Sequence, residues 1–196
     1  MAYKGLALVM YAMESEDTEG VPSYKDGGTI GRIMEYNLEP KFVDVSDYND
    51  MNELDPEYEF AYAELTLKTA EVVSNAHMMA LGASYYVGNI MSSDSRGHVT
   101  FKDIDRHRPI GIGLVRAERI KGTTRWTVTW LYKVKIETVK ENGETRGKDI
   151  NYNTPEIKAR AYTPGSGGWK RDVWFSTKED AVTYLQRVVA GTASIT

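Results

Sequence analysis

The sequence contains no cysteine, which excludes disulfides, thiolate nucleophiles and cysteine-bound zinc together. No apolar run approaches the roughly 20 residues that a membrane span requires, so no membrane anchor is expected. The first residues lack the longer apolar core and the small-residue cleavage site of a signal peptide. A linker rich in proline, glycine or serine is also missing. We therefore expect one domain over residues 1–196, made in a reducing cytoplasm.

An excess of basic residues is likewise absent, because the formal net charge is −4 at pH 7. This balance argues against a dedicated nucleic-acid binder. The charge is uneven along the chain: residues 1–70 hold 15 acidic and 5 basic side chains, and residues 71–196 hold 13 and 19. This uneven charge has two interpretations. In one, the two parts of the chain form complementary surfaces of neighbouring subunits; in the other, their strands interleave and mix the charges on every surface.

The clearest pattern that is present lies in residues 124–136, where polar and apolar side chains alternate. The apolar side chains predict a long strand with one buried face, and they are Trp126, Val128, Trp130, Tyr132, Val134 and Ile136. Residues 109–120 are the expected partner on one side, joined through Lys121-Gly122-Thr123. Residues 149–162 are the expected partner on the other side, after a turn at Asn142-Gly143. Together they predict a three-stranded antiparallel meander.

Strands are also expected elsewhere. Residues 4–13 are apolar on both faces, and residues 29–45 form one or two strands with Pro40 at an edge or a break. Residues 57–66 alternate, with Tyr58, Phe60 and Tyr62 on one side, which predicts a half-buried strand.

Two helices and two irregular segments complete the expected fold. One helix is predicted over residues 68–81, and another from the cap at Ser176, paired with Glu179, to Gly191. Residues 14–28 predict an extended arm or loop, and residues 163–170 a flexible loop. The expected fold class is mainly β with α (α+β): an antiparallel β sandwich or barrel with two flanking helices.

The residues that carry chemistry form no convincing catalytic site, so we expect no enzyme activity and no cofactor. The best metal candidate is a set of two histidines and two aspartates, but neighbouring basic side chains oppose a cation there and favour a solvated loop. The four are His98, Asp103, Asp105 and His107. Gly111 and Gly113 are not followed by a helix, which excludes a dinucleotide fingerprint and predicts close backbone packing or a bulge. Trp126 and Trp130 offer a ligand-stacking face, although such a stripe is typical of a core.

Several of these segments resemble the major tail protein family of siphophages. They are the run from Arg108 to Arg116 (RPIGIGLVR), Arg125-Trp126, the run from Trp130 to Lys135 (WLYKVK) and the run from Ile150 to Ile157 (INYNTPEI). The resemblance covers most of the chain and is most specific over residues 75–160.

The resemblance implies a tail-tube fold and a structural role in the virion. In that family six subunits form a ring, their inner sheets join into a barrel around a lumen, and stacked rings make a tube through which DNA passes. The implied partners are copies of this chain and other tail proteins, such as the tape measure and the terminator. DNA is implied only as a non-specific passing cargo.

Two sets of residues are candidates for this role. An acidic lumen would repel phosphates, and its candidate lining is Asp44, Asp47, Glu57, Glu59 and Glu64. The arm and the loop are expected to contact other subunits or stacked rings through Glu14, Glu16, Asp17, Glu19, Tyr24, Lys25, Trp169 and Lys170. Two other readings stay open: a single-ring tail component (terminator or baseplate hub), and a small β-barrel enzyme or ligand-binding protein that uses the Trp126 and Trp130 face.

Overall fold

A computed structural model describes the chain over most of its strands and its C-terminal helix. The described residues are 2–16, 22–30, 33–44, 48–49, 52–53, 58–69, 84–91, 94–100, 108–140, 156–165 and 167–193. Within them the fold is mainly antiparallel β with one α-helix, α2 (Lys178–Val189). The predicted helix over 68–81 falls outside the described residues, except for 68–69, which end a strand.

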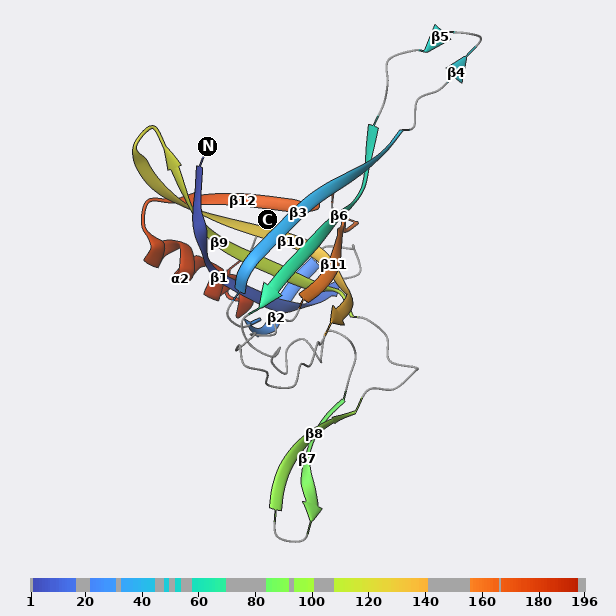
Figure 1. The fold of residues 1–196 in the computed structure, drawn as a ribbon, viewed down its shortest axis with the longest axis vertical. Coiled ribbons are helices and arrows are strands. Elements are labelled where there is room, and N and C mark those ends of the chain that lie inside the picture. Colours follow the sequence, from blue (N-terminus) through green and yellow to red (C-terminus); the bar gives the residue numbers. More distant parts are fainter. Residues whose placement is uncertain are drawn as a thin grey trace, which may run out of the picture.

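Eight strands form one large sheet in the order β2-β1-β9-β10-β11-β6-β3, and β12 pairs separately with β10. The strands are β1 (Ala2–Glu16), β2 (Pro22–Thr29), β3 (Ile33–Asp44), β6 (Tyr58–Thr69), β9 (Ile110–Ile120), β10 (Thr123–Lys140), β11 (Glu156–Tyr162) and β12 (Lys170–Phe175). Two short ladders are separate: β4 (Tyr48–Asn49) with β5 (Asn52–Glu53), and β7 (Ser84–Met91) with β8 (Asp94–Thr100). Figure 1 shows both ladders away from the large sheet.

The predicted meander of β9, β10 and β11 is confirmed. Lys121 and Gly122 join β9 to β10 with φ angles of 47° and 88°, which is the left-handed backbone that a two-residue hairpin turn requires. The turn predicted at Asn142-Gly143 lies outside the described residues. One edge of β10 pairs with β9, and the other edge is shared, because residues 126–131 pair with β12 and residues 133–140 with β11.

The single buried face predicted for β10 is wrong, because a register shift against β9 between Leu131 and Val134 moves the even-numbered side chains to the other face. Trp130 packs beneath α2, whereas Val134 and Ile136 lie on the opposite side of the sheet. Polar and apolar side chains do alternate along β10, but the apolar side chains belong to two different cores.

The inner core lies between the two halves of the curved sheet, and the helix-side core lies between the sheet and α2 (Figure 1). The buried side chains of the inner core are Val9, Tyr11, Ile30, Ala63, Leu65, Leu67, Ile110, Ile112, Leu114, Leu131, Val134, Ile136, Ile157, Ala159 and Ala161. Those of the helix-side core are Met10, Ala12, Tyr24, Val115, Val128, Trp130, Ala181, Leu185, Val188 and Val189. Strand β1 contributes to both, which confirms that it is buried on both faces.

Trp130 explains the two glycines of β9. A Cβ added to Gly111 would lie 2.2 Å from the Trp130 ring, and one added to Gly113 would lie 2.2 Å from Leu185 of α2. Close packing is therefore confirmed at both glycines, and Gly111 also lies opposite the register shift between Leu131 and Val134 of β10. Tyr24 closes the cluster with its ring edge against Trp130, at a centroid distance of 4.9 Å.

Strand β6 also changes face, at a register shift against β3 beside Phe60 and Tyr62. Phe60 packs against the inner core, and so do Ala63 and Leu65 beyond the shift. The prediction that Tyr58, Phe60 and Tyr62 share one side is therefore wrong for Tyr62. Strand β3 ends the sheet, which agrees with Pro40 marking an edge, because proline has no N–H to donate to a further strand.

The expected arm over 14–28 is wrong where the structure describes it. Residues 14–16 continue β1 and residues 22–28 belong to β2, with Glu14 opposite Tyr24. The C-terminal helix is confirmed with its cap moved by one residue: Thr177 Oγ1 accepts from the Asp180 N–H at 3.2 Å. Gly191 follows with φ 72°, as expected after a helix end.

Substituting Gly113 with Ala tests the packing of α2 on the sheet. The added methyl must displace Leu185 or the Trp130 ring, so we expect the free energy of unfolding to fall by about 1–3 kcal/mol. Urea unfolding followed by circular dichroism measures it. The exposed Arg119→Ala on the same strand is the control and should change stability by less than about 0.5 kcal/mol. Equal stability of the two variants would contradict this packing.

Candidate assembly surfaces

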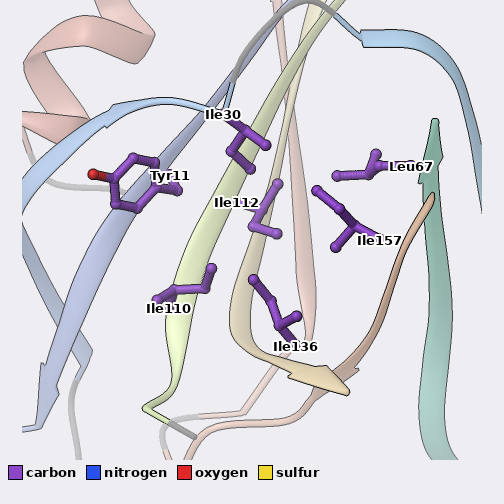
Figure 2. A pocket seen from close by; sticks show the side chains of 7 residues that line it. All are labelled: Tyr11, Ile30, Leu67, Ile110, Ile112, Ile136 and Ile157. Carbon is purple, nitrogen blue, oxygen red and sulfur yellow. The ribbon is translucent and has the colours of Figure 1, made fainter. Parts of the chain in front are cut away.

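The inner core holds a small void lined by seven apolar side chains (Figure 2). They are Tyr11, Ile30, Leu67, Ile110, Ile112, Ile136 and Ile157. Its volume of about 10 Å³ is barely that of one water position, and its wall offers a water almost no polar partner. This void is a packing defect and is too small for a ligand.

The Trp126 and Trp130 face is covered rather than open. Trp130 is 2% exposed, and Trp126 packs at the border of the helix-side core, with the Lys178 ammonium 5.9 Å from its ring centroid. The interpretation of this stripe as core is confirmed. A ligand that stacked on Trp130 would have to displace α2.

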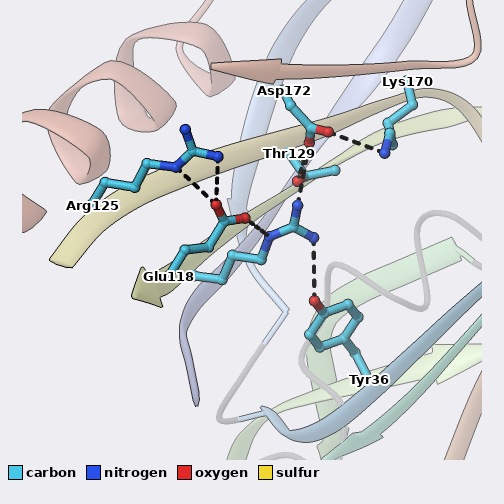
Figure 3. Close-up of polar contacts among 7 residues, drawn as sticks. Tyr36, Glu118, Arg125, Thr129, Lys170 and Asp172 are labelled. Carbon is cyan, nitrogen blue, oxygen red and sulfur yellow. Dashed lines mark hydrogen bonds and ion pairs between the residues drawn. The ribbon is translucent and has the colours of Figure 1, made fainter. Parts of the chain in front are cut away.

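A cluster of charged side chains lies where the inner face of β9, β10 and β12 meets β3 (Figure 3). Glu118 is 3% exposed and sits between two arginines: Arg116 Nε donates to one carboxylate oxygen at 3.1 Å, and Arg125 Nε donates to the other at 2.9 Å. Arg116 also donates to the Tyr36 hydroxyl of β3 at 3.3 Å. This clamp of Arg116, Glu118 and Arg125 therefore ties three strands together.

Asp172 of β12 extends the clamp. The Thr129 hydroxyl donates to it, Lys170 Nζ lies 3.0 Å from its carboxylate, and Arg116 lies 3.7 Å away. Strand β12 is thus bound to β10 by side chains as well as by its backbone ladder.

The electrostatics of the clamp favour permanent charge. Burial raises the pKa of Glu118, but hydrogen bonding to Arg125 and the charge of Arg116 outweigh burial, so this pKa lies below its usual value. Burial lowers the pKa of Arg116, yet Tyr36 and the two acidic neighbours outweigh it and the net shift is upward. Each charged group of the clamp is held by an oppositely charged or hydrogen-bonding partner, so the arrangement suits a structural ion network.

A second polar surface covers β3, β6, β11 and the end of β10, on the face turned away from the inner core. Acidic and basic side chains pair along it: Lys68 with Glu35 at 2.7 Å and Arg160 with Glu137 at 3.0 Å are two examples. Glu64 lies here, 3.9 Å from Lys41 and opposite Arg160 in the ladder. On this face, strands from the acidic and basic parts of the chain interleave and mix their charges.

Of the other predicted lumen residues, the two that the structure describes lie at the far ends of their strands from this cluster of ion pairs. Asp44 ends β3 and Glu59 lies near the start of β6, both exposed, while Asp47 and Glu57 fall outside the described residues. The face around Glu64 is mixed in charge rather than acidic, because each acidic group lies beside a lysine or an arginine.

The ribbon end, defined as Phe42–Asp44 of β3 with Tyr58 and Glu59 of β6, carries exposed apolar side chains. Phe42 is 57% exposed, Val43 52% and Tyr58 64%. In Figure 1 this end of β3 and β6 lies on the side of the large sheet nearest to β4 and β5.

The predicted subunit contacts separate into buried and exposed residues. Tyr24 is buried, and its hydroxyl donates to the Tyr132 carbonyl oxygen at 3.0 Å, so its role as an exposed contact is wrong. Trp169 is half-buried and stacks on Phe60 at 4.8 Å, with Lys170 5.5 Å from its ring. Lys25 is exposed and Glu14 is half-buried. Glu16 is described only as backbone in β1, and Asp17 and Glu19 lie outside the described residues.

Trp174 of β12 was not predicted as a surface residue, yet it is 59% exposed. The guanidinium of Arg125 lies 5.0 Å from its ring centroid while also binding Glu118. The signal was present in the sequence, since Lys170, Asp172 and Trp174 alternate with Val173 and Phe175.

In the part of the chain that the structure describes, no group of three or more potential metal-ligand side chains gathers. Of the predicted metal candidates, His98 is described only as backbone in β8, and Asp103, Asp105 and His107 lie outside the described residues. None of the described helices has the length and apolarity to cross a bilayer.

Substituting Glu118 with Gln tests the clamp. The variant leaves Arg116 and Arg125 without their shared carboxylate, and we expect stability at pH 7 to fall by roughly 3 kcal/mol. Because the folded pKa of Glu118 is depressed, its contribution is full above the unfolded pKa and is lost as pH falls through the folded pKa. The difference from the wild type should therefore shrink below about pH 4. Urea unfolding across pH measures it, and a pH-independent difference would argue against the clamp. The exposed Glu39→Gln is the control, with an expected loss under about 1 kcal/mol.

In comparisons with known proteins, no protein-family model matches the chain, and no curated protein matches it.

Proposed function

We propose that this chain is a structural subunit that assembles with copies of itself into a tube, as the major tail protein of a long-tailed phage. The observation that carries the proposal is the ribbon end, where three large apolar side chains stand in solvent on a hairpin that ends in an edge strand. Exposed apolar groups beside an unpaired strand edge are an aggregation hazard in a monomer, and a defined partner removes that hazard.

The resemblance to siphophage major tail proteins supports the same function. The residues that carry it follow the central meander: Arg108–Arg116 leads into β9, Trp130–Lys135 lies in β10, and Ile157 lies in β11. The described parts of the segments on which the resemblance depends are therefore neighbours in one sheet. The proposal takes from the family a sandwich or barrel of tail-tube type, six subunits to a ring, and stacked rings in the virion tail.

The face around Glu64, on which acidic and basic side chains pair, is compatible with a channel for DNA. An acidic lining is not needed to keep the DNA from binding. A surface whose acidic and basic groups pair offers phosphates no basic excess to bind. If this face lines the lumen, the DNA passes without sequence-specific contact. The tape measure and terminator proteins are the further partners that the proposal implies.

The two alternative functions predict different oligomeric states. A terminator or baseplate hub would form single rings, and a ligand-binding barrel would stay monomeric. The buried position of Trp130 weighs against the ligand-binding reading, because that reading used the Trp126 and Trp130 face.

Negative-stain electron microscopy of the purified chain separates the three functions. We expect long tubes of uniform width after concentration at neutral pH, with the tube fraction rising with protein concentration. Sedimentation velocity on the same samples gives the mass of any smaller species. Single rings at every concentration would favour the terminator or hub, and monomers at every concentration would refute self-assembly.

A further inference from the structure

Two exposed apolar sites lie at different ends of the subunit. The ribbon end presents Phe42, Val43 and Tyr58, and the C-terminal end of β12 presents Trp174. In Figure 1 the ribbon of β3 and β6 leads away from the sheet toward β4 and β5, whereas β12 leads toward α2 at the other side. One subunit therefore cannot cover its own Trp174 with its own ribbon end.

The two sites also differ in charge. The ribbon end carries the exposed carboxylates of Asp44 and Glu59 and has no lysine or arginine. The hairpin of β9 and β10 beside Trp174 has the opposite balance, because residues 116–125 contain four basic residues and the single acid Glu118. Opposite potentials of this kind steer two surfaces together and set their register.

Trp174 has the features of an interface anchor. Tryptophan and arginine are enriched where binding energy concentrates, and a side chain held in place before binding loses less entropy. Arg125 stacks on the Trp174 ring while its guanidinium is held 2.8 Å from the buried Glu118 carboxylate. The clamp thus fixes an exposed aromatic ring at the surface.

We propose that the ribbon end of one copy of this chain binds the Trp174 surface of the next, where the Trp174 surface is Trp174 with the hairpin residues Arg116–Arg125. The inference rests on the proposed function and names the contact that builds the assembly. Because the two surfaces differ, the contact is head-to-tail, and such contacts close into rings or continue as filaments. Asp44 and Glu59 then belong to a subunit contact and not to the lumen.

Complementary variants test the contact. Trp174→Ala removes one surface, and the double substitution Phe42→Ser with Tyr58→Ser removes the other; all three side chains are more than half exposed, so folding should persist. Each variant alone should associate at least about tenfold more weakly than the wild type and form no tubes. An equimolar mixture retains one intact pair of surfaces, so sedimentation velocity should detect a 1:1 heterodimer that neither variant forms alone.

Two controls make the result specific. Met34→Ser changes a similarly exposed apolar residue outside both surfaces, at 62% exposure, and should assemble like the wild type. If the ribbon double variant fails to fold, Asp44→Lys with Glu59→Lys keeps the apolar side chains and reverses the charge. That variant should also fail to associate with itself. Its Trp174 surface is intact and can bind the unchanged ribbon end of Trp174→Ala, so an equimolar mixture of these two variants should again form a 1:1 complex.

The outcomes separate the inference from the proposed function. If Trp174→Ala builds tubes at the wild-type concentration, this contact is wrong while the tube function stands. If neither variant assembles and their mixture also stays monomeric, the head-to-tail pairing is overturned. If the wild type never self-associates, the proposed function fails and the inference fails with it.

Discussion

Strand β10 makes backbone hydrogen bonds with three other strands, and the register shift between Leu131 and Val134 decides how the rest of the fold is arranged. Before the shift its large side chains meet α2, and after it they fill the inner core. One strand thereby supports two cores on opposite faces of the same sheet. The shared edge follows from the length of the same strand, since its 18 residues give room for both β11 and β12 on one side.

The clamp neutralises the charged side chains at one end of the inner face of the sheet. Inner-face positions of β9 and β10 are apolar near Ile112 and Leu131 but charged at Glu118 and Arg125. Each carboxylate oxygen of Glu118 receives an arginine, so burial leaves no oxygen without a partner. A buried ion pair of this kind is weak evidence for added stability, because desolvation offsets much of the attraction. Its value here is geometric, since it positions β3, β12 and the Trp174 ring.

Local patterns predicted the strands well and their faces less well. The alternation in 124–136, the two glycines under Trp130 and the helix ending at Gly191 all follow from spacing and backbone sterics. A register shift leaves no trace in such a pattern, so the division of β10 and the displaced face of β6 were not predictable. The loop predicted over residues 14–28 was wrong for another reason. Its acidic and glycine-rich composition is typical of a loop, but pairing of β2 with β1 and the burial of Tyr24 outweigh this local preference. Trp174 was missed because exposure depends on what the rest of the chain covers.

The pairing of distant strands has a consequence for how the subunit folds. Strand β1 pairs with β9, and β6 pairs with β11, across about a hundred residues of intervening sequence. During synthesis β1 and β6 therefore wait for β9 and β11 to leave the ribosome, and loop closure over such distances is slow. The last segments, β12 and α2, cover the Trp130 cluster and place Trp174 only at the end. A chain built in this order completes its own sheet before it offers a finished surface to a neighbour.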